Sequence, residues 1–266
     1  MSLAAASAVR AAEEFIPPGP REFDLPPVFS VAGIGITKPM LLLVLAVIVV
    51  FVFFYVAIRS RAMVPGRLQY MGEAGYAFVR NSISRDIIGQ HDFSRFTPYL
   101  FALFFFILVN NWFGSFPGIN FPTFSKASMA YALAGLSWLI YNGVGIARHG
   151  FFGYLKLQCV PPNITGPILV LLIPLEFFSN LVVRPVTLAL RLFANMFAGH
   201  LLIILFAVGG QYLLFEGATL LKPVGILAWV LFILIYFLEL LVQFLQAYVF
   251  VLLNAMYISG AVADEH

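Results

Sequence analysis

The sequence predicts an all-α polytopic membrane protein with about five membrane helices. Of its 266 residues, 62% are hydrophobic and only 10% are charged, whereas a soluble domain carries about 25% charged residues. Most of the charges lie before residue 96, and the remainder of the chain consists of long apolar runs separated by short polar segments. Such a chain lacks the polar surface that a water-soluble fold requires.

The composition also excludes several other classes of protein. A single cysteine, Cys159, excludes a disulfide scaffold. The net charge of +3 reflects scarce acids rather than a basic patch, so we expect no nucleic-acid partner. The four histidines are not spaced as a metal site, and the chain contains no phosphate loop or catalytic constellation. We therefore expect no metal, no cofactor and no enzymatic activity in this chain itself.

The predicted elements follow from the apolar runs. Residues 1–27 lack a strong apolar core, so we expect no cleavable signal peptide there, and residues 1–39 are predicted to form an external tail. Residues 40–266 are predicted to form a single membrane domain. Because a bilayer-spanning helix needs about 20 apolar residues, we expect helices at about 40–58, 97–116, 127–147, 168–208 and 224–259.

Basic residues set the expected orientation, since cytoplasmic loops carry an excess of Lys and Arg. Arg59 and Arg61 follow the first run, and Arg148 and Lys156 follow the third. These sites are expected in the cytoplasm, with the N-terminus outside and the C-terminus inside. Residues 66–95 read as an amphipathic segment on the cytoplasmic surface, with an ordinary loop as the alternative; its expected apolar positions are Leu68, Met71, Tyr76, Val79 and Ile83.

The last two apolar segments are too long for upright helices. At about 1.5 Å per residue, residues 168–208 would extend roughly 60 Å and residues 224–259 roughly 54 Å, against a hydrocarbon core of about 30 Å. Either each segment is one upright helix plus loops, or the two form a steeply tilted hairpin with kinks at Pro174 and Pro185.

Polar residues at helical spacing favour the tilted hairpin. Each long segment carries a stripe of polar side chains three or four residues apart, and such spacing places them on one helical face. The first stripe is Glu176, Asn180, Arg184, Thr187, Arg191 and Asn195, and the second is Tyr236, Glu239, Gln243, Gln246, Phe250, Asn254 and Tyr257. Two such stripes indicate facing surfaces or a wet path rather than lipid contact.

Arg191 is the sharpest functional candidate, because an arginine deep in an apolar helix costs at least about 2.5–3.5 kcal/mol. Snorkelling to the headgroups is the alternative, and it suits Arg184 better, since Arg184 lies nearer the cytoplasmic end. Glu239 and His200 also lie in apolar surroundings, where an acid and an imidazole can relay protons. A structural role remains the alternative for His200.

Three further candidates are weaker. Glu176 is either a carboxylate in an aqueous vestibule or an interfacial charge. Asn195 and Gln246 offer neutral hydrogen bonds inside the membrane, where such residues also serve as helix–helix contacts. Two functions remain open on these residues: an ion-translocating subunit whose arginine meets a partner's carboxylate, or a self-contained secondary transporter, although we find no internal repeat of the kind that transporters usually carry.

Two motifs resemble those of subunit a of F-type ATP synthases. The segment from Arg184 to His200 contains the pattern R-L-x-x-N-x-x-A-G, beginning at Arg191, and residues 245–250 read L-Q-A-x-x-F. Asn111-Trp112, Gly114 and Pro117 resemble the family's turn after the second span. The resemblance extends from about Met40 to the end of the chain.

The resemblance implies a role for each candidate. Arg191 corresponds to the essential arginine facing a ring of c subunits, and Asn195 and Gln246 to the polar positions beside it. His200 and Glu239 correspond to an acid–base pair of the outer half-channel, in the reversed order that also occurs in the family. Glu176 resembles the acid of the cytoplasmic half-channel, one residue from the usual spacing.

The family also implies partners and location. We expect the last two helices to lie as a tilted hairpin against the c-ring, with b-type peripheral stalk subunits and the rest of the F1F0 ATP synthase as partners in the lipid bilayer. The ion is expected to be the proton, with sodium as the alternative. The bacterial inner (plasma) membrane is the expected location, with the mitochondrial inner membrane as the alternative.

Overall fold

The computed structural model describes residues 18–19, 23, 26, 28–31, 34–59, 66–116, 118–160, 168–216 and 219–263. Most of the expected tail over residues 1–39 lies outside these ranges, as does Pro117. The described elements are β1 (Phe29–Val31), β2 (Ile34–Ile36), α2 (Lys38–Arg59), α3 (Arg67–Val79), η2 (Arg80–Arg85), α4 (Asp86–Ile88), α5 (Phe93–Phe113), η3 (Thr123–Ser125), α6 (Ala127–Cys159), α7 (Leu169–Phe178), η4 (Ser179–Val183), α8 (Arg184–Phe215), η5 (Thr219–Leu221) and α9 (Lys222–Val262).

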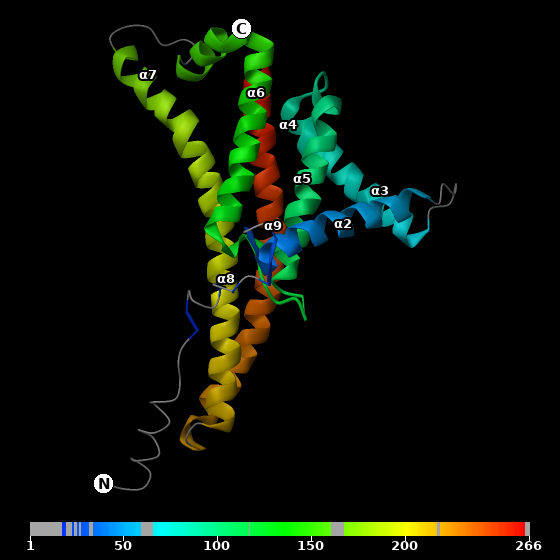
Figure 1. Cartoon of the computed structure of the whole chain (residues 1–266), viewed down its shortest axis with the longest axis vertical. Coiled ribbons are helices and arrows are strands. Elements are labelled where there is room, and N and C mark those ends of the chain that lie inside the picture. The colour runs from blue at the N-terminus through cyan, green and yellow to red at the C-terminus, as the bar shows by residue number, and fades with distance from the viewer. Residues whose placement is uncertain are drawn as a thin grey trace.

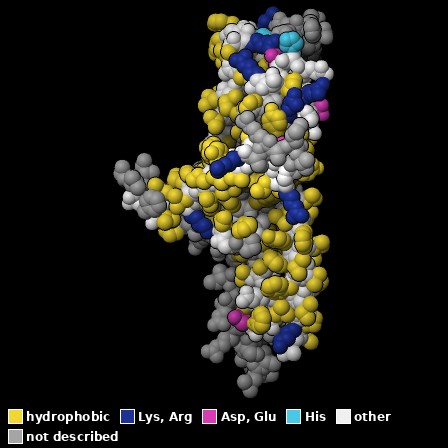
Figure 2. All heavy atoms as spheres, turned by 90° about the vertical axis from the view of Figure 1, so that its right-hand side faces the viewer, with side chains coloured by type: hydrophobic (Ala, Val, Ile, Leu, Met, Phe, Trp, Pro, Cys, Tyr) yellow, Lys and Arg dark blue, Asp and Glu magenta, His cyan; other side chains and the backbone are white. Residues whose placement is uncertain are grey.

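The predicted fold class is confirmed. Within the described ranges, five helical segments are long and apolar enough to cross a membrane, so the chain is a multi-pass membrane protein. Figure 2 shows the corresponding surface: apolar side chains cover most of the visible face, and most of the visible Lys and Arg lie in its upper half. A short antiparallel pairing of β1 with β2, just before α2, was not predicted.

The bundle is built on a long antiparallel pair, α8 and α9, with α5 and α6 packed beside it (Figure 1). Its interior consists of large side chains that are fully buried, among them Leu100 and Phe104 from α5, Leu192 from α8 and Phe250 from α9. In a bilayer such helices are held together by close packing rather than by exclusion of water.

The direction of α2 relative to α8 and α9 indicates how the long pair is tilted in the bilayer. Helix α2 projects sideways from the bundle, across the long axis of α8 and α9 (Figure 1). Its 22 residues extend about 33 Å, close to the thickness of a hydrocarbon core of about 30 Å. The 41 residues of α9 extend about 62 Å. A bilayer that α2 crosses directly is therefore crossed obliquely by α8 and α9, as the length argument predicts.

Helix α6 continues past the expected end at residue 147. Gly150 has a φ of 73°, a left-handed conformation that glycine adopts without steric cost. The chain turns there and remains helical to Cys159. The second part folds back over the first, so that the ring of Tyr154 lies against Gly145, where any side chain would overlap it.

The segment expected as one helix over residues 168–208 contains a π-helical turn, η4, between α7 and α8. Pro185 explains the position of this turn, because it has no backbone N–H to donate and its ring crowds the preceding turn. On the N-terminal side of η4, α7 leans away from α6 (Figure 1). The kink expected at Pro185 is therefore a widened turn.

The expected amphipathic segment is helical, but its apolar positions do not form one buried face. Val79 and Ile83 are buried in the core, whereas Leu68, Met71 and Tyr76 are exposed. The reason is that α3 projects beyond the edge of the bundle, and only its end meets α5 (Figure 1).

We expect Leu100→Ala to destabilise the bundle by about 1–3 kcal/mol. The substitution leaves a cavity among fully buried side chains, while the transfer between two apolar media contributes little. Leu136→Ala, at a position on α6 that is 55% exposed, is the matched control. The measurement is thermal unfolding of the purified protein in mild detergent, and equal melting temperatures for the two variants would contradict this packing.

Candidate functional site

The two polar stripes meet where Asn195 contacts Gln246 and where Arg184 contacts Tyr257. Asn195 of α8 donates from Nδ2 to Oε1 of Gln246 on α9, at 2.7 Å. Gln246 is buried and Asn195 is half-buried, so this bond joins the two helices inside the apolar bundle. Other members turn toward α5 and α6 instead: Gln243 bonds to Ser115 after α5, and Asn180 bonds to Gln158 of α6.

Arg191 lies one helical turn from Asn195, on the exposed side of α8. No hydrogen bond or ion pair joins its guanidinium to another residue in the described part of the chain. The neighbouring side chains Leu190 and Leu192 are apolar. Arg191 is thus a fixed cation that faces outward from an apolar helix, and it forms no ion pair with a described acid.

Arg184, for which snorkelling to the headgroups was one of two alternatives, makes a contact with α9. Its guanidinium lies 5.1 Å from the ring centroid of Tyr257 on α9, within the range of a cation–π contact. The side chain is half-buried. Arg184 is therefore held between α8 and α9, seven residues from Arg191.

Glu239 is buried, with 7% of its surface exposed, and belongs to a polar cluster that α5 and α9 form together. Gln243 donates from Nε2 to Oγ of Ser115 at 2.8 Å and to Oε1 of Glu239 at 3.3 Å. The hydroxyl of Tyr236 donates to the Ser115 carbonyl at 2.7 Å, and Asn111 donates from Nδ2 to the Gln243 carbonyl at 3.1 Å.

Sequence reasoning missed Ser115 and assigned no such contact to Asn111. Asn111 lies in the last turn of α5 and Ser115 just after it, and polar residues at the end of an apolar run are typical of a loop. The available signal was the match of Asn111, Trp112 and Gly114 to a family turn, which did not indicate which helix these residues contact.

His200 is also buried, but it makes no hydrogen bond with Glu239 or with any other described residue. Its ring lies 5.7 Å from that of Phe23, which in turn packs against Phe197 at 4.9 Å. Glu239 lies beside the preceding residue, Gly199, where an added side chain would overlap the carboxyl group. The two titratable groups thus occupy neighbouring positions at the α8–α9 contact.

Glu176 is half-buried on α7. Asn180, one turn later, donates from Nδ2 to the Gln158 carbonyl at 2.6 Å and, at 3.4 Å, to Oε2 of Glu176. Glu176 is separated from Arg191 by about 22 Å of helix, and His200 lies about 14 Å beyond Arg191. One titratable group therefore lies on each side of the fixed cation.

The chemistry that this arrangement supports is proton exchange at separate acids and an imidazole. In the described ranges, no group of three or more His, Cys, Asp or Glu side chains could hold a metal ion. The fold and these residues define a polytopic membrane protein with buried ionisable groups along a pair of oblique helices.

Comparison with known proteins gives the family. The family model of the ATP synthase A chain matches residues 40–259. The ATP synthase subunit a of Nocardioides sp. is 68% identical over 98% of this chain and 99% of its own length. The corresponding proteins of Pseudarthrobacter chlorophenolicus and Rhodococcus erythropolis are 49% and 39% identical, over 95% and 96% of this chain and 96% and 94% of theirs. The chain belongs to the ATP synthase A chain family.

Gly199→Ala should displace the Glu239 carboxyl without unfolding the bundle, because the overlapped atoms are the end of a flexible side chain. A displacement of about 1 Å at a reacting group can cost up to about 100-fold in rate. We therefore expect ATP-driven ion pumping in inverted membrane vesicles to slow about tenfold or more. Gly135→Ala, where an added Cβ meets nothing within 4 Å, is the control. Equal pumping by both variants would show that the position of Glu239 is unimportant.

Proposed function

We propose that the chain is the ion-channel subunit of the membrane sector of a bacterial rotary ATP synthase. In this role it forms two offset half-channels that carry protons to and from carboxylates on a ring of c subunits. The observation that carries the proposal is Arg191, an outward-facing cation on an apolar helix. No acid among the described residues forms an ion pair with it. Its counter-charge must come from outside the described chain, and a ring carboxylate meets that need.

Protons enter, in this proposal, from the outer side past Glu239 and His200. Both groups are buried, and both exchange protons near neutral pH in suitable surroundings. Sodium transfer would require oxygen ligands but no imidazole, so this pair favours the proton. Gln243, which also donates to Ser115, donates the hydrogen bond that holds the Glu239 carboxyl in place along the path.

Arg191 separates the two half-channels. A guanidinium is not deprotonated at any relevant pH, so it cannot pass protons between them. It favours the ionised form of a carboxylate opposite it, so a ring carboxyl that arrives protonated must release its proton. Once the entry half-channel has protonated it again, the neutral carboxyl can enter the lipid, whereas an ionised one would pay a large desolvation cost.

The released proton leaves toward the cytoplasm near Glu176. The expected partners are the c-ring, b-type peripheral stalk subunits and the nucleotide-binding part of the complex, and this chain itself carries out no catalysis. The bacterial sources of the relatives support the bacterial inner membrane as its location. A self-contained transporter gains no support, because the cation of such a protein would need an acid of its own and no described residue supplies one to Arg191.

Replacing Arg191 tests the proposal. Arg191→Ala should abolish ATP-driven proton pumping in inverted vesicles, while passive proton leak persists or rises, because nothing then separates the half-channels. Arg191→Lys should also fail, since an ammonium is a more strongly hydrated point charge and lacks the planar fork. Lys222→Ala, at the exposed start of α9, is the control and should pump normally. Near-normal acidification by Arg191→Ala would defeat the proposal.

Replacing the outer pair tests the entry path. Glu239→Gln retains the shape and hydrogen bonding of the side chain but removes its proton exchange, which typically contributes about 100-fold or more to a proton-transfer step. We expect slow ATP synthesis with the complex intact, and a larger loss when His200→Leu is added. Assembly is checked by co-purification. Wild-type synthesis in the double variant would rule out the outer relay.

A further inference from the structure

Phe23 lies in the segment that precedes the family-matched residues 40–259, yet its side chain is buried, with 4% of its surface exposed. Its ring packs against three aromatic side chains of the membrane domain. The ring centroid of Phe23 lies 4.9 Å from that of Phe197, 5.7 Å from that of His200 and 6.3 Å from that of Phe121. A residue outside the family-matched part of the chain thus contacts a titratable group in the middle of α8.

Contacts with α2, α5 and the segment after α5 hold the Phe23 ring in place. Its buried neighbours in these elements form one apolar cluster with it: Leu42, Ala46, Phe113 and Phe121. Lys38, at the start of α2, donates from Nζ to the Ile119 carbonyl at 2.9 Å, and its ammonium lies 5.7 Å from the centroid of the Phe121 ring. These contacts tie the segment of Phe121 to α2, so that Phe23 packs against a fixed surface.

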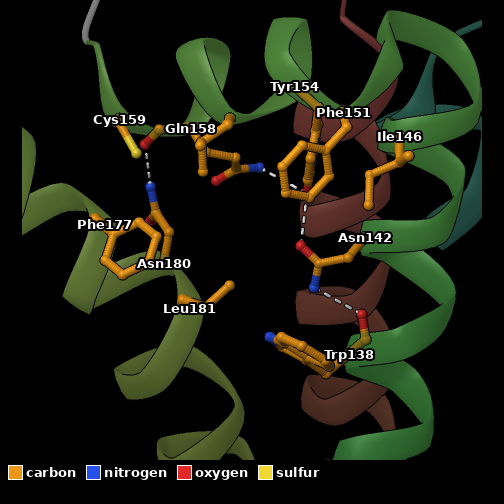
Figure 3. A pocket seen from close by; sticks show the side chains of 11 residues that line it. Trp138, Asn142, Ile146, Phe151, Tyr154, Gln158, Cys159, Phe177, Asn180 and Leu181 are labelled. Atoms are coloured by element: carbon orange, nitrogen blue, oxygen red, sulfur yellow. Dashed lines mark hydrogen bonds between the residues drawn. The ribbon is translucent and has the colours of Figure 1, made fainter.

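His200 lacks the hydrogen bonds that orient other polar side chains of the bundle. In α6, for comparison, Gln158 donates from Nε2 to the Tyr154 hydroxyl at 2.9 Å, and this hydroxyl donates to Oδ1 of Asn142 at 3.1 Å (Figure 3). The imidazole of His200 instead meets the Phe23 ring at an interplanar angle of 59°, a tilted arrangement that aromatic rings at this separation prefer. Its orientation therefore depends on the contact with Phe23.

The polar and charged groups near His200 belong to a different cluster from Phe23. Glu239 of α9 lies against Gly199, the residue before His200, and accepts a hydrogen bond from Gln243. Lys38, the cation beside the Phe23 cluster, is engaged by the Ile119 carbonyl, and the side chains that pack around Phe23 are apolar. Because ordered water needs polar partners, it is favoured on the Glu239 side of the imidazole and disfavoured on the Phe23 side.

We propose that Phe23 is a positioning residue for His200. Its ring covers the imidazole and holds it in one orientation, so that protons reach His200 from the side of Glu239 and not through the aromatic cover. The inference rests on the proposed function for the role of His200 in proton entry. It adds to that function a residue that lies outside the family-matched range.

Chemical modification of His200 measures the cover directly. Diethyl pyrocarbonate acylates a neutral imidazole nitrogen, and the reaction of a covered group follows the fraction of time for which it is uncovered. The intact complex in lipid nanodiscs is treated at a pH above the ordinary histidine pKa of about 6.5, and the modified peptides are quantified by mass spectrometry. His91, which is exposed between α4 and α5, is the internal reference.

We expect Phe23→Ala to raise the modification rate of His200, relative to His91, by at least about tenfold. Phe23→Leu keeps an apolar cover and should change this rate by less than about threefold. Phe116→Ala, which removes a ring that is 61% exposed just after α5, is the matched control and should leave it unchanged. Phe23→Val takes the place of Phe23→Ala if the latter fails to assemble. Equal rates in the unaltered complex and in the truncated variant would overturn the proposal.

A double-mutant cycle shows whether Phe23 acts through His200. Phe23→Ala should slow proton-driven ATP synthesis by about three- to tenfold, because a small displacement of a reacting group is costly. In the His200→Leu background the same substitution should cause no further loss, since the imidazole that Phe23 positions is then absent. A loss of equal size in both backgrounds would show a purely structural role and would overturn the proposal.

Two outcomes separate this inference from the proposed function. Faster modification of His200 in Phe23→Ala, with unchanged ATP synthesis, would show a cover that has no part in proton delivery, which overturns the positioning role alone. Normal pumping by Arg191→Ala would overturn the proposed function, and the modification rates would still decide whether Phe23 covers His200.

Discussion

The guanidinium of Arg191 is a permanent positive charge on a helix whose neighbouring side chains are apolar, and the other features of the site are arranged around it. Within a membrane such a charge costs at least about 2.5–3.5 kcal/mol. Arg184, two turns away, is held by the ring of Tyr257. Arg191 has no ion pair with a described carboxylate, and in the proposed function a carboxylate of a partner subunit stabilises it on the outward face of α8.

The pairing of α8 with α9 fixes where this charge stands. Asn195 and Gln246 join the helices one turn from Arg191, and Gly199 leaves room for the Glu239 carboxyl a further turn along. The length of both helices makes their path through the bilayer oblique. Titratable groups at opposite ends of an oblique pair are offset laterally as well as in depth, which is the geometry that two separate half-channels require.

Composition and the length of apolar runs were enough to predict the fold class and the candidate residues, because apolar length and helical spacing are local properties. Contacts between helices are not local. The stripe on α9 was expected to form a facing surface or a wet path; Gln246 and Tyr257 do contact α8, but Gln243 bonds to Ser115 after α5. The fold-back of α6 depends on Gly150, whose left-handed conformation a sequence pattern does not reveal. Helix α3 is partly exposed because it projects beyond the bundle.

The central claim is that Arg191 meets an acid supplied by another subunit. Electron cryo-microscopy of the intact complex in lipid nanodiscs tests it most directly, by locating the guanidinium relative to every neighbouring chain. The account predicts that the exposed side of α8 at Arg191 faces a carboxylate of a ring subunit, directly or through one water molecule. A guanidinium that lies against lipid, or that pairs with a carboxylate of its own chain, would contradict it.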